Sequence, residues 1–191
     1  MRDVLTPGQM LAVQARLRPD RIGARDLERA MTFRQWNARA CRLANALLGL
    51  GLTKGERVAV LAYNCVEWLE IYAAMAKAGL VAVPINFRLV GQEVRYILED
   101  AEVSALILQD ELAGTIEEIR ADLPVAESRV VWFGAAPCPA GFSAYEGLIA
   151  RAREDEPGTP IDPADPWMLM YTSGTTGKPK GAIRSHRGAA M

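Results

Sequence analysis

Short apolar runs of strand length alternate with helix-like segments along most of this chain, and this alternation limits the folds open to it. The runs occupy residues 57–62, 81–85, 105–109, 129–133 and 167–171. Segments with apolar residues at helical spacing lie at 33–48, 65–78, 92–100, 112–121 and 142–153. Each run is apolar almost throughout, as strands are when helices cover both faces of a parallel sheet. The alternation predicts a three-layer α/β fold with a mainly parallel sheet flanked by helices.

Capping signals mark the ends of two of these helices. Thr32 followed by Gln35 is a capping-box pattern, which predicts that the first helix begins just after Thr32. Asn64 with Glu67 three residues later predicts the start of the second helix. Gly79 predicts the end of that helix, because glycine readily adopts the left-handed conformation found at helix C-termini.

The composition places the chain among globular proteins and excludes several function classes. Half of its 191 residues are hydrophobic, which is too many for a disordered chain and suits one domain. The net charge is −1, from 22 basic and 23 acidic residues, whereas a dedicated nucleic-acid-binding protein usually has a large basic excess. Polar residues interrupt the first 20 positions and prolines interrupt the longest uncharged run, at 130–145. We therefore expect no signal peptide and no transmembrane segment.

The three cysteines, Cys41, Cys65 and Cys138, are widely spaced, and His186 is the only histidine. This set contains too few soft ligands for a structural zinc site and does not form a disulfide framework. It is typical of a protein of the reducing cytoplasm, so we expect a cytoplasmic location and interpret Cys41 and Cys65 as core residues. No motif in the sequence predicts the ligands of a catalytic metal.

A glycine-rich segment at residues 171–181, Tyr-Thr-Ser-Gly-Thr-Thr-Gly-Lys-Pro-Lys-Gly, is the part of the sequence that carries chemistry. It follows an apolar run and combines Ser and Thr hydroxyls with three glycines and two lysines. Glycines let a backbone approach an anion closely, amides and hydroxyls donate hydrogen bonds to it, and lysine supplies positive charge. The segment therefore predicts a loop, from Thr172 to Gly181, that binds a polyphosphate and is poorly ordered without one.

Other interpretations of this segment are a Walker A loop and a flexible surface linker. The Walker A loop is excluded, because it has four residues between its glycines and only two separate Gly174 from Gly177. A flexible surface linker is not excluded by the composition of the segment, because such linkers are also rich in Gly, Ser and Thr. No acidic residue occurs from Trp167 onward, which favours anion binding over a linker, although a solvated basic face has the same charge. The basic residues here are Lys178, Lys180, Arg184 and Arg187.

The segment at 171–181 resembles the phosphate-binding signature of the adenylate-forming enzymes, which include acyl-CoA synthetases, luciferases and nonribosomal adenylation domains. Ser185-His-Arg, just after it, is similar to the Ser-His-Arg that often follows in acyl-CoA synthetases. Other stretches resemble the amino-terminal part of fatty-acid and related acyl-CoA ligases, and they are Thr32-Phe-Arg, Arg42-Leu-Ala-Asn-Ala-Leu, Lys54-Gly-Glu-Arg-Val-Ala-Val, Val83-Pro-Ile-Asn-Phe-Arg-Leu and Tyr96-Ile-Leu-Glu-Asp. The resemblance covers nearly the whole chain, from about Thr6 onward.

This resemblance implies an acid–thiol ligase. In such an enzyme a carboxylate attacks the α-phosphate of Mg²⁺-bound ATP to give an acyl-adenylate and pyrophosphate, and the thiol of coenzyme A then displaces AMP. Matched position by position, the resemblance implies that the ATP-binding residues are Thr172, Ser173, Gly174, Thr175, Thr176, Gly177 and Lys180. Lys178 falls at a variable position of the motif. Similarity at residues 86–89 favours a fatty or aryl acid as the substrate.

The resemblance also implies that residues 1–191 are an incomplete, amino-terminal portion of the large domain of these enzymes, without the carboxy-terminal small domain. The later family motifs do not occur in this sequence. They are the motif whose acidic residue helps to hold magnesium, the aspartate that binds the ribose hydroxyls, and the lysine used in adenylation. We therefore expect the chain alone to be inactive and assign it no catalytic residue. A non-catalytic module with the same fold and at most weak nucleotide binding is the alternative. Formation of a homodimer through an exposed edge of the sheet is a further alternative.

His186 is interpreted as a residue at the start of a helix or behind the site. The histidine that lies near the carboxylate substrate in the family belongs to a later motif, so the resemblance does not imply a catalytic role for His186.

Overall fold

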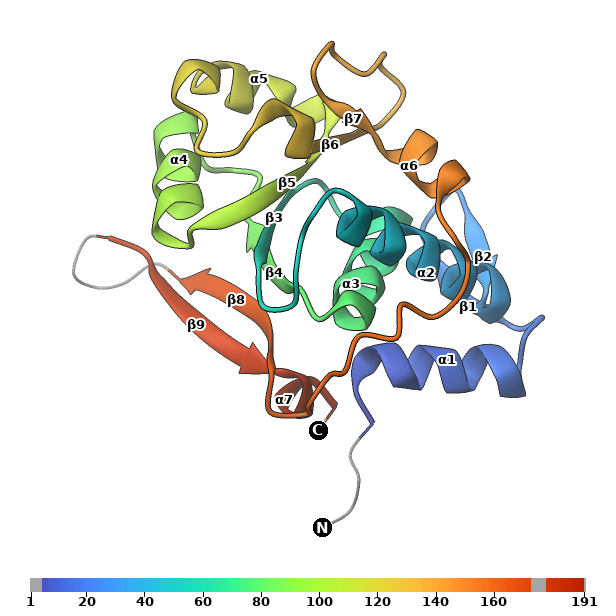
Figure 1. The fold of residues 1–191 in the computed structure, drawn as a ribbon. Helices are drawn as coiled ribbons and strands as arrows, with labels where there is room; N and C mark the ends of the chain where they lie inside the picture. The colour runs from blue at the N-terminus through green and yellow to red at the C-terminus, as the bar shows by residue number, and fades with distance from the viewer. Residues whose placement is uncertain (1–4, 173–177, 191) are drawn as a thin grey trace.

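The computed structural model describes residues 5–172 and 178–190, and a seven-stranded sheet forms its centre. The strands are β3 (Arg57–Leu61), β4 (Val81–Ile85), β5 (Val103–Gln109), β6 (Val130–Phe133), β7 (Ser143–Ala144), β8 (Pro166–Thr172) and β9 (Lys180–Ser185). Their order across the sheet is β7-β6-β5-β3-β4-β8-β9 (Figure 1). Every neighbouring pair is parallel except β8 and β9, which are antiparallel. The predicted mainly parallel sheet, including the strands at 57–62, 81–85 and 105–109, is confirmed.

Both faces of the sheet are buried at its central strands, which explains the continuous apolar runs. Successive residues of a strand point to opposite faces. In β3, Val58 and Val60 belong to one hydrophobic cluster, whereas Ala59 and Leu61 belong to another. All four side chains are at most 1% exposed. Residues 58–61 of the central strand therefore each contribute to one of two cores, and only Arg57, at the start of the strand, is polar.

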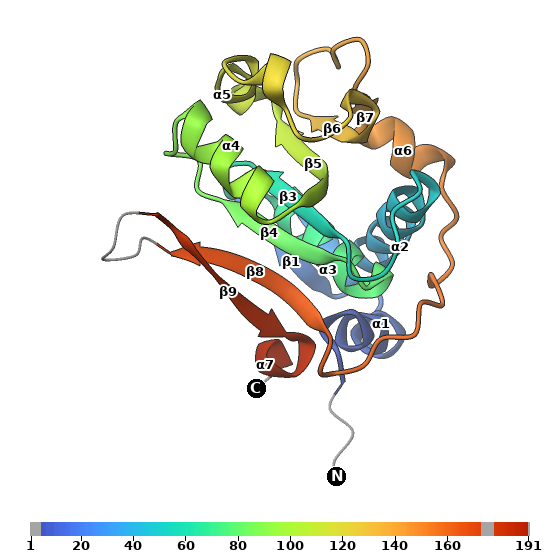
Figure 2. The same ribbon diagram turned by 60° about the vertical axis from the view of Figure 1, so that its left-hand side comes forward.

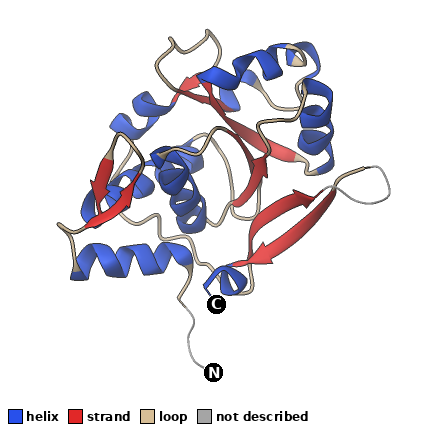
Figure 3. Ribbon diagram, turned by 180° about the vertical axis from the view of Figure 1, so that it is seen from behind, coloured by secondary structure: helices blue, strands red, loops and turns tan. Residues whose placement is uncertain are grey.

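Helices cover the two faces in a way that follows from the strand order. One face is covered by α2 (Phe33–Gly49), α3 (Val66–Ala78) and α6 (Tyr145–Arg151), and the other by α4 (Gly91–Asp100) and α5 (Ala113–Glu117) (Figures 2 and 3). The chain moves from β3 to β4 in one direction and from β4 back past β3 to β5 in the other. Since crossovers between parallel strands are right-handed, two crossovers in opposite directions place α3 and α4 on opposite faces.

Four further elements surround this framework, and the alternation of apolar runs with helical segments predicted none of them. They are α1 (Pro7–Leu17), the antiparallel pair β1 (Ile22–Arg25) and β2 (Ala30–Thr32), and α7 (His186–Ala190). Helix α1 packs on the outer side of α2 and α3, where Leu11 contacts the cluster that contains Ala40 and Ala73. It also contacts α7. Of the helices that the structure describes, none is both long enough and apolar enough to cross a bilayer.

The start of α2 is as predicted, but the start of α3 is not. The Gln35 amide donates to Thr32 Oγ1 at 3.2 Å and the Thr32 amide donates to Gln35 Oε1 at 2.9 Å, so the capping box forms. Asn64 does not cap α3, because the N-cap is Cys65 and its side chain makes no capping bond. The Val66 amide donates instead to Asp26 Oδ2 at 3.0 Å. A carboxylate from the β1–β2 connection thus replaces the local cap.

Two predicted helices are shorter than their sequence patterns. Helix α5 is bounded by the 3₁₀ turns Asp110–Leu112 and Arg120–Asp122, and a third turn, Glu127–Arg129, precedes β6. Helix α6 begins only at Tyr145, because Ser143 and Ala144 pair with Val131 and Trp132 as strand β7. Sheet pairing therefore takes the backbone groups that would have formed the first turn of the predicted helix.

Gly79 ends α3 in the left-handed conformation, with φ of 71°, as predicted. We expect Gly79→Ala to lower the free energy of unfolding by about 1–2 kcal/mol, since a Cβ is strained in this conformation. The new Cβ would also lie 3.0 Å from Lys54 Cγ. Gly49→Ala is the matched control, because no atom lies within 4 Å of a Cβ there. It should raise stability slightly, since alanine favours the helix. Urea denaturation measures both changes, and equal effects would contradict this explanation.

Candidate functional site

Strands β8 and β9 form a hairpin that carries the glycine-rich segment at its end. Thr172 is the Cα partner of Lys180, and Tyr171 is the partner of Gly181. The hairpin leaves the rest of the sheet, since β8 pairs with β4 only at Met168 and Ala82. In Figures 1 and 2 it extends as an arm beside β4 and α4. Directly opposite residues of an antiparallel pair have side chains on the same face, so the Thr172 hydroxyl and the Lys180 ammonium are carried on one face of the hairpin.

The structure describes only part of the predicted ATP-binding set. Thr172 ends β8, Lys180 begins β9, and both are exposed. The predicted loop from Thr172 to Gly181 is therefore too long, because strand pairing extends into it from both sides. The remaining predicted residues lie outside the described part of the chain, as does the prediction of poor order for them, and they are Ser173, Gly174, Thr175, Thr176 and Gly177.

Gly181 has a packing role that the sequence did not indicate. It lies in β9, and a Cβ at this position would be 2.7 Å from Leu169 Cδ1 and 3.3 Å from Tyr171 Cζ. The missing side chain leaves room for Leu169 and Tyr171 to cross the hairpin. The third glycine of the motif, which was not among the predicted ATP-binding residues, thus serves contact between the two strands.

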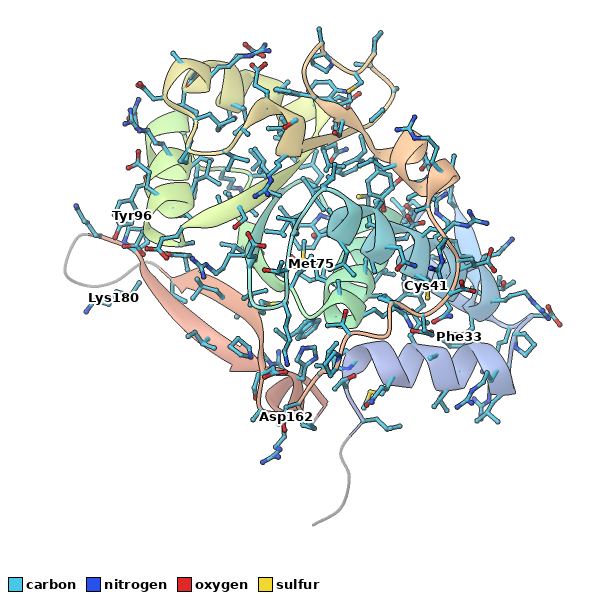
Figure 4. The ribbon with its side chains drawn as sticks, in the orientation of Figure 1. Phe33, Cys41, Met75, Tyr96, Asp162 and Lys180 are labelled. Atoms are coloured by element: carbon cyan, nitrogen blue, oxygen red, sulfur yellow. The ribbon has the colours of Figure 1, made fainter. Side chains whose placement is uncertain are left out.

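Helix α4 contacts the end of β8 and the residues just before β9, close to Thr172 and Lys180. The Tyr171 hydroxyl donates to Asp100 Oδ2 at 2.5 Å. The Tyr96 hydroxyl lies 3.4 Å from Asp100 Oδ1 and 3.5 Å from the carbonyl oxygen of Pro179, and Lys178 Nζ lies 5.1 Å from the centroid of the Tyr96 ring. Figure 4 shows Tyr96 and Lys180 on these neighbouring elements. Sequence reasoning did not select Tyr96 or Asp100, although their spacing of four residues places them on one face of a helix.

Both tyrosines are neutral hydrogen-bond donors at physiological pH. Burial, followed by the hydrogen bond to Asp100, raises the pKa of Tyr171 far above its ordinary value. Burial and the charge of Asp100 also raise the pKa of Tyr96. The phenol protons therefore remain in place for donation to the carboxylate.

His186 begins α7, as its interpretation as a helix-start residue anticipated, and is fully buried. Its ring packs against Trp167 with 6.3 Å between the centroids, and its amide donates to the Asp165 carbonyl oxygen at 3.1 Å. Within the described chain neither ring nitrogen has a hydrogen-bond partner. Burial lowers the pKa of His186, Asp165 opposes that shift, and Lys54 adds to it. The geometry assigns His186 to the packing at the base of the hairpin.

We expect His186 to make the protein less stable in mild acid. Its pKa is lower in the folded chain than the ordinary value of 6.5, so the unfolded chain binds the proton more readily. The stability that depends on neutral His186 is fully present above about pH 6.5. It is lost as the pH falls through the pKa of His186 in the folded chain. Urea denaturation at several pH values should show a loss of stability below pH 6.5 that His186→Phe reduces. Identical pH dependences for the two proteins would contradict this assignment.

The described residues contain neither an evident nucleophile nor a metal-binding cluster. No three His, Cys, Asp or Glu side chains come together in residues 5–172 and 178–190 to hold a metal ion. Burial raises the pKa of the Cys41 and Cys65 thiols to about 12, so both are protonated at neutral pH. What the site offers chemically is a hydroxyl and a cation placed side by side, which suits binding of an anion.

The fold and this hairpin place the chain in a class of α/β proteins that includes acyl- and aryl-CoA ligases. The crystal structure of the anthranilate CoA ligase AuaEII in complex with anthranoyl-AMP superimposes with a TM-score of 0.90 and 31% sequence identity, over 98% of this chain and 36% of that one. Long-chain-fatty-acid–CoA ligase FadD13 of Mycobacterium tuberculosis (strain ATCC 25618 / H37Rv) is 40% identical over 156 residues, which are 82% of this chain and 30% of that protein. Indoleacetate–CoA ligase of Aromatoleum aromaticum is 37% identical over 172 residues, which are 90% of this chain and 33% of that protein.

The family profile of the AMP-binding enzymes matches residues 11–191. This chain belongs to the AMP-binding enzyme family. It spans about a third of the length of the curated relatives that it matches. The family resemblance that the sequence motifs indicated is therefore confirmed.

Proposed function

We propose that residues 1–191 supply the phosphate-binding hairpin of a carboxylic acid–CoA ligase. In the proposed reaction a carboxylate oxygen of the acid attacks the α-phosphorus of ATP, and the bond from that phosphorus to the pyrophosphate oxygen breaks. The products are an acyl-adenylate and pyrophosphate. The sulfur of coenzyme A then attacks the acyl carbon, and AMP leaves as the thioester forms. The contribution of this chain is to hold the pyrophosphate part of ATP.

The observation that carries the proposal is the pairing of Thr172 with Lys180 on the β8–β9 hairpin. The pairing presents a hydroxyl and an ammonium group on either side of residues 173–179. Negative charge develops on the departing pyrophosphate, and a fixed cation with hydrogen-bond donors beside it lowers the barrier. On the sequence motif, the same site is proposed to include Ser173, Gly174, Thr175, Thr176 and Gly177.

The names of the relatives support a fatty or aryl acid as the substrate. FadD13 is named as a long-chain fatty acid ligase, another relative as an indoleacetate ligase, and the AuaEII complex contains anthranoyl-AMP. We propose that Mg²⁺ enters with ATP, since this ion usually keeps phosphate and water ligands and few protein ones. Three free cysteines agree with a cytoplasmic location.

We further propose that residues 1–191 form the amino-terminal portion of the large domain, with adenine, ribose and most acid contacts made elsewhere in a longer protein. The chain matches about a third of each relative, which supports this division. It follows that the 191 residues alone should bind ATP weakly and should not turn it over.

The test is acid-dependent pyrophosphate release from ATP, measured with a panel of fatty and aromatic acids. The protein encoded by the complete reading frame is compared with the 191-residue chain. We expect release by the first with at least one acid, followed by thioester formation when coenzyme A is added, and no release by the second. Turnover by the 191-residue chain would contradict the proposed division. A complete protein that binds ATP but releases no pyrophosphate with any acid would favour the non-catalytic module.

A further inference from the structure

Helix α4 contacts the hairpin at the end of β8 and just before β9, within one residue of two proposed phosphate ligands, Thr172 and Lys180. We propose, resting on the function proposed above, that Tyr96 and Asp100 are positioning residues that dock the phosphate-binding hairpin on α4. Their task is to fix the place of Thr172 and Lys180 before ATP arrives. Neither residue touches the reacting atoms in this proposal.

The first contact holds the β8 strand. Tyr171, which directly precedes Thr172, donates its hydroxyl proton to the Asp100 carboxylate at 2.5 Å across 71 positions of sequence. Hydrogen bonds to an ionised acceptor are the stronger kind. The absent side chain at Gly181 lets the Tyr171 ring cross the hairpin toward α4. This hydrogen bond to the Asp100 carboxylate therefore fixes the direction of β8 near its end.

The second contact holds the segment that enters β9. The Tyr96 hydroxyl lies at long hydrogen-bond distance from two acceptors, 3.4 Å from Asp100 Oδ1 and 3.5 Å from the carbonyl oxygen of Pro179. The ammonium of Lys178 lies over the Tyr96 ring, 5.1 Å from its centroid, which is within range of a cation–π interaction. Pro179 directly precedes Lys180, so this contact lies next to the second proposed ligand.

Register pairing joins the hairpin to the rest of the sheet only near the start of β8. Beyond the pairing of Met168 with Ala82, β8 has no further register partner in β4. Tyr96 and Asp100 lie one helical turn apart and so present both contacts from the same face of α4. A displacement of even 1 Å between a cation and the charge it stabilises is costly in catalysis. Docking on α4 therefore supplies the precision that the strand pairing lacks.

The first measurement is hydrogen–deuterium exchange of the nucleotide-free protein encoded by the complete reading frame. Tyr171→Phe removes one hydroxyl, Asp100→Asn removes the charge, and Tyr96→Leu removes the ring under Lys178. We expect amide exchange in β8 and β9 to become several-fold faster in all three variants, with exchange in β3 unchanged. Tyr63→Phe is the matched control, because Tyr63 is a partly exposed tyrosine outside these contacts. Exchange in the hairpin that equals wild type in all three variants would overturn the proposal.

The second measurement separates positioning from general stability. In the pyrophosphate assay we expect Tyr171→Phe to raise the KM for ATP by about three- to tenfold, the size of one exposed hydrogen bond to a charged group. The KM for the acid and the thermal midpoint should stay within experimental error. Tyr96→Phe keeps the ring under Lys178 and should retain most of the affinity that Tyr96→Leu loses.

The outcomes distinguish this inference from the proposed function. An active wild-type protein with an unchanged KM for ATP in Tyr171→Phe and Asp100→Asn would overturn the positioning role and leave the ligase proposal standing. A wild-type protein without activity on any acid would overturn the ligase proposal, and the exchange rates would still decide whether α4 docks the hairpin. Equal rises in the KM for ATP and for the acid would indicate general damage and overturn the inference.

Discussion

Lys180→Ala is expected to slow acid-dependent pyrophosphate release by about 10²- to 10³-fold in the protein encoded by the complete reading frame, the usual cost of one lost contact to developing charge. The ammonium at the start of β9 is the cation that we propose to lie beside the departing pyrophosphate. Its loss removes stabilisation that is larger in the transition state than in bound ATP. The effect should therefore appear mainly in kcat, in contrast to the KM effect expected for Tyr171→Phe.

Lys180→Arg and Arg184→Ala provide the matched controls for this prediction. Lys180→Arg keeps the charge and should recover part of the lost rate. Arg184→Ala removes another exposed cation from the same strand, whose guanidinium, within the described part of the chain, donates only to the carbonyl oxygen of Gly188. It should change the rate less than threefold. Equal losses in Lys180→Ala and Arg184→Ala would show that only the general positive field matters, and an unaffected Lys180→Ala would remove Lys180 from the proposed site.

Glu70→Ala is expected to cause the largest loss of stability, about 3 kcal/mol of the free energy of unfolding. Glu70 lies on α3 with 2% of its surface exposed. Its carboxylate accepts from Arg39 Nε at 2.6 Å and from the Tyr145 hydroxyl at 2.8 Å, which joins α3 to α2 and α6. Burial and the nearby carboxylate raise the pKa of Tyr145 well above its ordinary value, so its phenol is a permanent donor. Removal of the carboxylate leaves that buried donor without its partner.

Two companion variants test whether the buried network causes this loss. Glu70→Gln keeps an acceptor of the same shape and should cost less than Glu70→Ala. Tyr145→Phe removes the hydroxyl alone and should cost about 1 kcal/mol. Because the two residues share a hydrogen bond, the double variant should lose less than the sum of the two single losses. Additive losses, or a Glu70→Ala protein within 1 kcal/mol of wild type, would contradict the interpretation.

Local patterns were sufficient to predict the central framework. The buried strands are recognisable as apolar runs because residues 58–61 of β3 each enter one of two cores. The start of α2 was predictable because its capping box joins residues only three positions apart. The prediction depended on such local signals, so elements that lack them were missed. Strand β9, for example, is exposed along most of its length and has no apolar run to mark it.

The sequence by itself determined the fold class, the family and the motif that we propose binds phosphate, since each of these depends on neighbouring residues along the chain. Only the tertiary structure decided how the motif is held. The Asp26 cap on α3 spans 40 positions and the contact between Tyr171 and Asp100 spans 71. Single polar side chains at such distances leave no periodic signal, because their partners are chosen by the packing of whole elements. The packing of α4 beside the end of β8 brings Asp100 to Tyr171, the contact that we propose sets the direction of the hairpin.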